Sequence, residues 1–587
     1  MVKGISGSAF DFPILKRVFA FTLPYKKYFY VSVVLTLLLA ALSPLLPWLV
    51  QYTVDAYIMT SNAPGLVNML ILMIALLLFR GIIQFAHTYY TNLLGQLAVR
   101  DMRTKLFSHI LGFRTSYFDQ TPVGTLVTRS VSDLETVADI FSEGLIVIIG
   151  DLLTLFVIVG FMFYVDWRLT LISLSTIPLL LIAANIFKNG IKDAFRQVRT
   201  QVAHLNAFVQ EHITGMNVVQ IFNREEAEMQ KFENINALHR QAHIKSNWYY
   251  SIFFPVVELL SASSIALLVW WGARGVLHDQ VTLGNLIAFI MFINLLFRPI
   301  RELADKFNTL QLGMVSSERI FKVFDTHEVI DDTGTVSDTK IKGDIQFENV
   351  WFAYKDEDWI LKDLSLKIPS GKMTALVGAT GSGKSSIINI IGRYYDFQKG
   401  NILLDGAGIR NYKLSFLRKN IAMVLQDVFL FSDTVYNNIT LNNESISREK
   451  VEEAARAVGV DGFIEKLPGR YDYVVGERGA TLSTGQRQLI SFVRAYVYNP
   501  CILVLDEATS SIDTETELMI REATDRLTQN RTSIVIAHRL ATIQRADNII
   551  VLEQGKIAEE GTHSELLRKG GLYKKLYEAQ FAAMEAV

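Results

Sequence analysis

An eight-residue run at 378–385, Gly-Ala-Thr-Gly-Ser-Gly-Lys-Ser, has the residue types and spacing of a phosphate-binding loop. Its glycines let backbone N–H groups close around phosphate oxygens, and the N-terminus of a following helix adds a favourable dipole. Lys384 supplies a positive charge for the β- and γ-phosphates, and the Ser385 hydroxyl suits a Mg²⁺ ligand. A chance glycine-rich turn is the alternative. The flanking pattern argues against it, because residues 373–377 predict a strand before the loop and residues 385–391 predict a helix after it.

Two adjacent carboxylates form a second candidate group. Asp506 and Glu507 follow an apolar run at 501–505 that predicts another buried strand. Asp506 is suited to hold Mg²⁺ through water, and Glu507 is suited to polarise an attacking water as general base. Alone, the pair would be interpreted as an acidic strand end that faces solvent. With a phosphate-binding loop upstream, it predicts a site that hydrolyses a nucleotide.

These groups need a fold that brings them together, and the second half of the chain predicts one. From about residue 345, short β-rich runs alternate with helical runs, which is typical of an α/β domain. The segment near 325–342 is polar, rich in Asp, Thr and Gly, and predicts a linker.

The first half of the chain predicts membrane spans. Six apolar stretches lie near 28–54, 66–92, 140–165, 169–187, 248–273 and 281–305. Each has, or nearly has, the roughly 20 residues of helix that cross a bilayer. Buried helices of a large soluble domain are the alternative. The stretches at 66–80 and 145–165 argue against it because they hold almost no polar residues.

Basic residues predict the orientation of the spans. The connections near 55–65, 166–168 and 274–283 hold only Arg168 and Arg274, whereas those near 94–138 and 188–247 hold many basic residues. The positive-inside rule therefore places both long connections and both termini in the cytoplasm. Their helical periodicity predicts transmembrane helices that extend into the cytosol. Residues 10–23 predict either a short amphipathic helix in the cytoplasmic interface or a solvated tail.

Four charged residues, Arg80, Asp151, Glu258 and Arg298, fall within or near the apolar stretches. Charge inside a membrane is costly and by default marks a functional position. Arg80 and Arg298 are therefore candidate contacts for an anionic group on a transported molecule. An internal ion pair, or a side chain that reaches the end of the span, is the alternative.

The overall composition excludes some classes of partner and crosslink. The formal net charge is −1, so no global charge argues for nucleic acid. Cys501 is the single cysteine, so no disulfide forms within the chain, and we expect it to be a small core residue.

A third motif carries a family resemblance. Residues 482–486, Leu-Ser-Thr-Gly-Gln, resemble the signature of ATP-binding cassette (ABC) ATPases, which usually reads Leu-Ser-Gly-Gly-Gln. Tyr354 stands where that family has an aromatic residue that stacks on adenine. Gln426 resembles the Q-loop glutamine, residues 510–513 resemble the D-loop, and His538 resembles the switch histidine. Glu477, within 475–479, resembles a loop found in exporters.

The resemblance implies a set of site residues. Catalytic roles fall to Glu507, His538 and Gln426, and Mg²⁺ ligation falls to Ser385, Gln426 and Asp506. The residues implied to bind ATP are Tyr354, Gly378, Ala379, Thr380, Gly381, Ser382, Gly383, Lys384, Ser385, Ser386, Ser483, Gly485, Gln486 and Asp513.

Six spans ahead of one such ATPase resemble the half-transporters of ABCB-type exporters, which include bacterial multidrug exporters and the lipid A flippase. Residues 124–129 with Asp133 resemble the first cytoplasmic loop of these exporters, and residues 215–225 resemble the second. The implied fold is an all-α six-helix transmembrane domain at 1–322, a linker at 323–343 and an α/β P-loop nucleotide-binding domain at 344–587. The implied activity is ATP-driven export or flipping of amphipathic, hydrophobic or lipid-like molecules across the bacterial inner membrane.

The motifs also imply a dimer, because the family holds ATP between the P-loop of one domain and the signature of another, and this chain has one of each. Short transverse segments near 116–121 and 214–219 are expected to dock on the nucleotide domains. A homodimer is favoured. Thr484 replaces the first glycine of the usual signature and leaves a heterodimer open, since some heterodimeric exporters carry one weakened site.

Other functions remain open at this point. An ATP-gated channel or membrane regulator can use the same fold, although no added regulatory domain is present. The six spans oppose a soluble ABC ATPase, and an importer usually has its membrane and ATPase parts on separate chains. Arg80-Gly81 and Arg298-Pro299 resemble positions that face an acidic glycolipid in the lipid A flippase, which favours an anionic lipid cargo only slightly.

Overall fold

The computed structural model describes residues 11–506, 514–537 and 540–580. The chain divides into two compact units. The first contains Met1–Leu111 and Val123–His327, and the second contains Gly112–Pro122 and Glu328–Val587. The short segment Gly112–Pro122 therefore belongs with the C-terminal unit although it lies early in the sequence.

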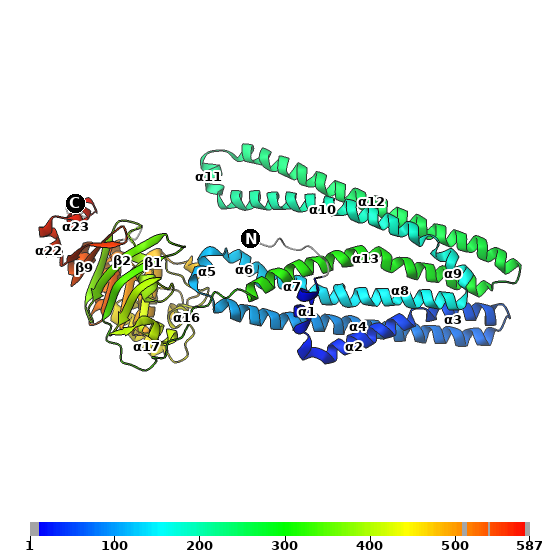
Figure 1. Cartoon of the computed structure of the whole chain (residues 1–587), viewed down its shortest axis with the longest axis horizontal. Coiled ribbons are helices and arrows are strands. Elements are labelled where there is room, and N and C mark those ends of the chain that lie inside the picture. Colours follow the sequence, from blue (N-terminus) through cyan, green and yellow to red (C-terminus); the bar gives the residue numbers. More distant parts are fainter. Residues whose placement is uncertain (1–10, 507–513, 538–539, 581–587) are drawn as a thin grey trace. The chain divides into compact units, whose positions relative to one another are not determined.

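The first unit is entirely helical (Figure 1). Its α-helices are α1 (Phe12–Ala20), α2 (Lys26–Leu42), α3 (Leu45–Thr53), α4 (Ala63–Leu111), α6 (Val123–Ser130), α7 (Ser132–Asp139), α8 (Leu145–Val165), α9 (Trp167–Leu174), α10 (Ile177–Thr214), α11 (Met216–Ile221), α12 (Glu225–Leu277) and α13 (Leu283–Phe324). Short π-helical turns, Val54–Ile58 and Ile140–Gly144, extend α3 and join α7 to α8.

Several of these helices are long and apolar enough to cross a membrane. Among the described residues there are five such helical stretches, Leu23–Ile58, Ala63–Leu111, Val123–Val165, Trp167–Thr214 and Glu225–Leu277, and a shorter apolar stretch, Leu283–Pro299. They coincide with the six predicted apolar stretches. Most continue well past the length of a bilayer core, so the predicted extensions are helical.

Local sequence sets where the helices turn. Asp166 caps the start of α9, because its Oδ1 accepts from the backbone N–H groups of Arg168 (2.8 Å) and Leu169 (3.1 Å). Thr282 caps α13 in the same way through the N–H of Asn285 (3.1 Å) and donates its hydroxyl hydrogen to Asp55 Oδ2 (2.7 Å). The Thr282–Asp55 bond also joins the start of α13 to the π-helical turn that follows α3.

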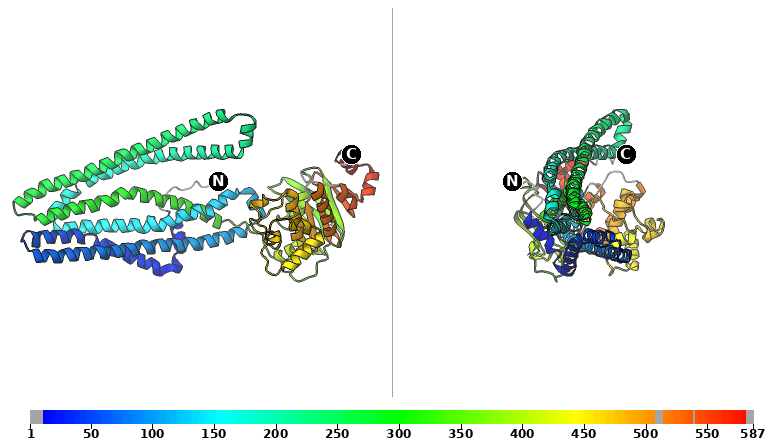
Figure 2. Two further views of the ribbon diagram at one scale, coloured as in Figure 1. Left: turned by 180° about the vertical axis from the view of Figure 1, so that it is seen from behind. Right: turned by 90° about the vertical axis from the view of Figure 1, so that its right-hand side faces the viewer.

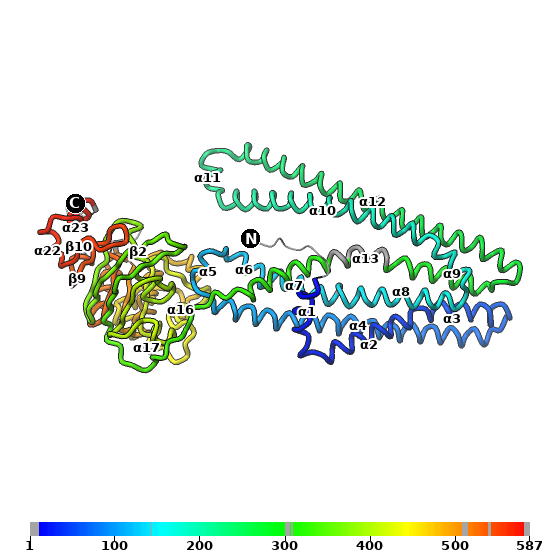
Figure 3. The backbone as a smooth tube through the Cα atoms, in the orientation of Figure 1, coloured from blue at the N-terminus to red at the C-terminus, as the bar shows by residue number. Residues whose placement is uncertain are grey.

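Helices α10 and α12 pack on each other as a long hairpin, and Figure 2 shows them side by side over much of their length. Gly190 on α10 permits this close approach, since a Cβ atom there would lie 2.3 Å from the Tyr249 ring. The short helix α11 forms the tip of the hairpin, as the backbone trace in Figure 3 shows. Large apolar side chains at this tip are exposed: Ile213, Val218, Ile221 and Phe222.

One predicted intramembrane charge has an internal partner. Asp151 on α8 pairs with Lys306 on α13 at 2.5 Å, and both side chains are mostly buried. The ion-pair interpretation therefore holds for Asp151. The pair links two helices inside the unit and offsets the cost of burying either charge alone.

The second unit is an α/β structure with a six-stranded and a four-stranded sheet. Its strands are β1 (Ile345–Ala353), β2 (Trp359–Ile368), β3 (Met373–Gly378), β4 (Lys399–Leu404), β5 (Ala407–Gly408), β6 (Ile421–Val424), β7 (Ile502–Asp506), β8 (Thr532–Ile536), β9 (Asn548–Glu553) and β10 (Lys556–Gly561). Its α-helices are α5 (Thr115–Gln120), α14 (Lys384–Ile391), α15 (Leu414–Asn420), α16 (Val435–Thr440), α17 (Arg448–Val458), α18 (Asp461–Glu465), α19 (Thr484–Val497), α20 (Thr514–Thr528), α21 (Leu540–Arg545), α22 (His563–Lys569) and α23 (Leu572–Gln580).

The larger sheet has the order β10-β9-β3-β8-β7-β6, and all its neighbouring pairs from β9 to β6 are parallel. Both faces are buried, as expected for a parallel sheet. On β7, Leu503 and Leu505 join one hydrophobic cluster, and Ile502 and Val504 join the other. The fold class predicted from sequence, a helical membrane domain fused to an α/β nucleotide-binding domain, is thus confirmed.

Candidate nucleotide-binding and hydrolysis site

The parallel sheet places several predicted site residues at the carboxyl ends of its strands. Strands β3, β8, β7 and β6 are consecutive neighbours, and their carboxyl ends therefore lie side by side. Gly378 ends β3, Asp506 ends β7, and Gln426 follows β6 by two residues. Open α/β sheets bind ligands at this edge. The structure thus places the end of β3, where the loop begins, and Asp506 at the same end of the sheet.

The loop between β3 and α14 requires its glycines. Gly383 has φ +104°, a left-handed value that favours glycine, and a Cβ atom there would lie 2.6 Å from Leu361 Cδ2. At Gly378, a Cβ atom would lie 2.4 Å from the carbonyl oxygen of Leu552. The loop can therefore keep this tight path, ahead of the N-terminus of α14, only without side chains at these two positions.

Lys384, the first residue of α14, is buried and holds the loop closed. Its Nζ donates to the carbonyl oxygens of Gly378 (2.8 Å) and Ala379 (2.9 Å). Burial lowers the pKa of Lys384, and the Asp506 carboxylate acts in the opposite direction. The ammonium group is thus held inside the loop by two neutral carbonyl oxygens. Phosphate oxygens could replace these acceptors.

Two serines of the loop fit a phosphate and cation ligand. Ser382 Oγ is buried and has no hydrogen-bond partner among the described residues, which is costly unless a ligand supplies one. Ser385 follows Lys384 in the first turn of α14 and is exposed. A buried polar atom without a partner beside an exposed hydroxyl matches a loop shaped to hold a phosphate group with its cation.

The aromatic residue predicted to stack on adenine is hydrogen-bonded to α14 through its hydroxyl group. The Tyr354 hydroxyl lies 3.1 Å from Ser386 Oγ and accepts from Asn389 Nδ2 at 3.1 Å, so the ring is tied to α14. The residue is 38% exposed. Tyr354 is therefore fixed next to the phosphate loop while part of its surface stays open to a base.

The signature residues begin a separate helix. Ser483 caps α19 through a reciprocal pair of bonds: its Oγ accepts from the N–H of Gln486 (3.2 Å), and its own N–H donates to Gln486 Oε1 (3.0 Å). Gly485 is buried in the first turn. Within the described part of the chain, no hydrogen bond or ion pair joins residues 482–486 to residues 378–386.

Comparison with known proteins identifies the family. Residues 29–300 match the family described as ABC transporter transmembrane region, and residues 361–510 match the family described as ABC transporter. The chain belongs to the ABC transporters. It is a multi-pass membrane protein of the exporter type that hydrolyses ATP and couples this reaction to transport.

Its relatives match along almost their whole length. The chain is 36% identical, over 98% of its residues and 95% of the relative, to an uncharacterized ABC transporter ATP-binding protein of Bacillus subtilis (strain 168). It is 35% identical, over 97% of its residues and 99% of the relative, to the ATP-dependent lipid A-core flippase of Desulfotalea psychrophila. It is also 35% identical, over 97% and 99%, to a putative multidrug export ATP-binding/permease protein of Bacillus subtilis.

The transporter's departure from the usual signature is accommodated locally. Thr484 is exposed, and its Oγ1 accepts from an Arg487 guanidinium nitrogen on the same helix at 3.2 Å. The same guanidinium group donates to the carbonyl oxygen of Leu482 at 3.0 Å. The extra side chain is thus bonded within its own helical turn, and the capping bonds of Ser483 are intact.

The remaining predicted site residues of the transporter fall partly inside and partly outside the described part of the chain. Glu507, Asp513 and His538 lie outside the described residues. Gln426 is exposed just after β6. Arg80 lies in α4 and Arg298 lies in α13, directly before Pro299. Their assignment as substrate contacts stays a prediction.

Reasoning from sequence missed Tyr395, which contacts the residue predicted to stack on adenine. The Tyr395 ring packs edge-on against Tyr354 at 4.8 Å, and its hydroxyl donates to Asp119 on α5. Burial raises the pKa of Tyr395, and the bond to Asp119 raises it further. Tyr395 thus connects the predicted docking segment near 116–121 to Tyr354, the residue predicted to stack on adenine. No local signal marks Tyr395, because the contact joins residues that are distant in the sequence.

We expect Tyr395→Phe to loosen α5 without removing the ring that supports Tyr354. The lost hydrogen bond to a partly exposed carboxylate contributes about 1 kcal/mol. Backbone amides of Thr115–Gln120 should therefore exchange with deuterium about fivefold faster, measured by mass spectrometry on the full-length protein. Tyr394→Phe is the matched control, since Tyr394 instead lies beneath Arg418. Equal exchange in the two variants would contradict the assigned role.

Proposed function

We propose that the protein exports or flips an amphipathic, hydrophobic or lipid-like molecule across the bacterial inner membrane as a dimer of half-transporters. One observation carries the proposal: each chain holds one phosphate loop and one signature helix, and no described hydrogen bond or ion pair joins them. A second chain can supply the missing half of each site. The apolar side chains exposed around α11 support the same conclusion, because an exposed apolar patch usually marks an interaction surface.

The proposed dimer can be tested by disulfide crosslinking. Cys501 is the only cysteine, so a Cys501→Ser background has none. Chains carrying Thr380→Cys are mixed with chains carrying Ser483→Cys, both exposed positions. With ATP present, we expect a crosslink between chains. A chain with both cysteines that crosslinks only within itself would reject the shared site, and Ser445→Cys in place of Ser483→Cys is the exposed control.

The chemistry we propose follows the strand ends. Tyr354 stacks on adenine, the residues 378–386 surround the phosphates, and Ser483, Gly485 and Gln486 of the second chain close over them. Glu507 accepts the proton of the attacking water as general base, and His538 and Asp513 complete the site. When bound, Mg²⁺ would neutralise charge on the phosphates. Ser385, Gln426 and Asp506 are the residues we propose to hold it.

The proposed coupling uses the difference in ATP affinity between open and closed dimers. ATP drives closure only to the extent that it binds the closed state more tightly. Closure moves α5, bonded through Tyr395, and α11 at the tip of the long hairpin. Both termini and the nucleotide-binding unit lie on the cytoplasmic side, as the basic connections near 94–138 and 188–247 suggest.

The cargo is tested by transport itself. Purified protein in proteoliposomes is supplied with a panel of lipids and amphipathic drugs, and we expect one class to stimulate ATP hydrolysis and to move across the bilayer in a vanadate-sensitive way. The panel contains lipids and drugs because two relatives are named a lipid A-core flippase and a putative multidrug export protein. Stimulation without vectorial movement would favour a gated channel. Activity that requires a neighbouring half-transporter would show a heterodimer.

A further inference from the structure

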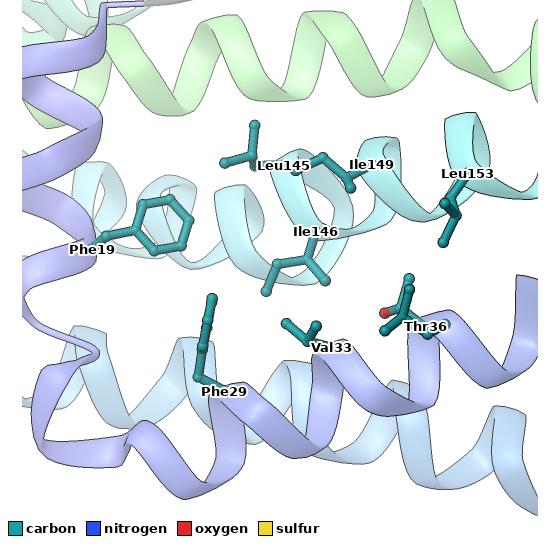
Figure 4. A pocket seen from close by; sticks show the side chains of 9 residues that line it. Phe19, Phe29, Val33, Thr36, Leu145, Ile146, Ile149 and Leu153 are labelled. Carbon is teal, nitrogen blue, oxygen red and sulfur yellow. The ribbon is translucent and has the colours of Figure 1, made fainter.

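An apolar cavity of about 150 Å³ lies between α1, α2 and α8 in the helical unit. Figure 4 shows Phe19 of α1 and Phe29 and Val33 of α2 facing Ile146 and Ile149 of α8 across it. The remaining lining residues are Thr36, Leu37, Leu145 and Leu153. Leu37 and Ile149 are each about half exposed, at 51% and 54%, so the cavity is open at one side.

The lining is suited to hydrocarbon and unsuited to water. Its one hydroxyl, Thr36 Oγ1, already donates to the Ser32 carbonyl oxygen (2.8 Å) and lies 3.0 Å from His87 Nε2. A water there would lack the 2–4 polar partners it needs, and dry cavities of about this volume bind small apolar groups. Because α2 and α8 belong to candidate membrane spans, the hydrocarbon available to fill the cavity is a lipid acyl chain.

The end of α2 near the cavity is basic. Lys26 precedes Phe29 by three residues and therefore lies on the same face of α2, one turn before the cavity. Lys26 and Lys27 are exposed, and neither has an ion-pair partner among the described residues. Two free ammonium groups beside an apolar cavity complement a lipid with an anionic head group.

The turn before α2 packs against a basic segment of α4. The Tyr25 hydroxyl donates to Asp101 (2.8 Å) and accepts from Arg100 (2.7 Å). Lys105 lies 5.1 Å from the centre of the Phe21 ring. The turn is thus fixed against the basic segment of α4, with Asp101 as an acid that Arg100 already neutralises.

We propose that one anionic phospholipid binds here, with an acyl chain between α1, α2 and α8 and its phosphate at Lys26 and Lys27. Neither Arg80 nor Arg298 lines the cavity, and the proposed binding requires neither ATP nor transport. The bound lipid would lie against α1. This helix is anchored to the end of α13 by Arg17, which forms a two-point ion pair with Asp325 (2.8 and 2.7 Å). Helix α13 ends at Phe324, and the nucleotide-binding unit resumes at Glu328. The backbone therefore connects the helix that anchors α1 directly to the ATPase.

The test is photocrosslinking of the full-length protein in phosphatidylcholine nanodiscs without nucleotide. Trace phosphatidylglycerol or phosphatidylcholine carries a photoreactive group in its acyl chain, and crosslinked peptides are mapped by mass spectrometry. Each lysine near an anionic surface contributes about fivefold. We therefore expect phosphatidylglycerol to label the cavity residues at least fivefold more than phosphatidylcholine does. Labelling around Phe156 and Tyr164, exposed residues of α8 outside the cavity, should show no such preference.

Two variants separate the head-group and acyl-chain contributions. Lys26→Gln with Lys27→Gln should remove the preference, whereas Lys192→Gln with Lys245→Gln, on α10 and α12, should keep it. Ile149→Trp should fill the cavity mouth and reduce labelling there, whereas Leu152→Trp, exposed on the same helix but not lining the cavity, should not. Equal labelling by the two lipids, or a preference unchanged by the lysine variants, would overturn the proposal. Neither outcome bears on the proposed export function.

Discussion

Lys384→Met is expected to abolish ATP hydrolysis, with a loss of at least about 100-fold in kcat. Lys384 Nζ is the buried cation of the phosphate loop, and it is bonded only to the carbonyl oxygens of Gly378 and Ala379 among the described residues. Methionine keeps the length of the side chain but removes the charge that meets the phosphates. Steady-state ATPase assays and nucleotide binding by calorimetry would measure the effect.

The matched control for this variant is Lys367→Met on β2, which removes an exposed lysine near Asp344. We expect the control to keep normal ATPase activity. Hydrolysis by Lys384→Met within tenfold of the parent protein would show that phosphate binding does not depend on this ammonium group.

Glu507→Gln is expected to stop turnover while ATP binding persists. Glutamine is close to glutamate in shape but cannot accept a proton, and a general base contributes about 10²–10⁴-fold. The position directly follows Asp506 at the carboxyl end of β7, the edge where the phosphate loop also lies. A single-turnover assay together with ATP-binding measurements would separate the two steps.

The control for the second variant is Glu444→Gln, an exposed glutamate between α16 and α17. We expect it to leave hydrolysis unchanged. Parent-like hydrolysis in Glu507→Gln would reject Glu507 as the base, and loss of ATP binding would show that the residue acts in binding rather than in chemistry.

Features with short-range signals could be predicted from the sequence. The phosphate loop was predictable because glycine, lysine and serine stand at fixed spacing between a strand and a helix, and the structure places it between β3 and α14. The membrane stretches were predictable because apolar residues accumulate over the length of a span. The capping serine of the signature is likewise visible from Ser483 and Gln486, which are three residues apart.

Features that depend on long-range packing could not be predicted. Lys306 is the partner of Asp151, yet 155 residues separate them and nothing local relates the two. Tyr395 and Asp119 are 276 residues apart, so their bond follows only from the folded unit. The cavity beneath α1 is also invisible in the sequence, because it depends on gaps left between side chains of three helices.

The assignment of Gly112–Pro122 to the nucleotide-binding unit has a mechanical consequence. The backbone passes between the two units three times, at 111–112, 122–123 and 327–328. A unit attached by a single linker can swivel about it, whereas several attachments transmit torque. A protease cut at the linker alone would leave the halves tied together through α5, and an ATPase fragment starting at Glu328 would lack the helix that bonds Tyr395. The nucleotide-binding unit and the membrane helices are therefore joined by the backbone at three points rather than one.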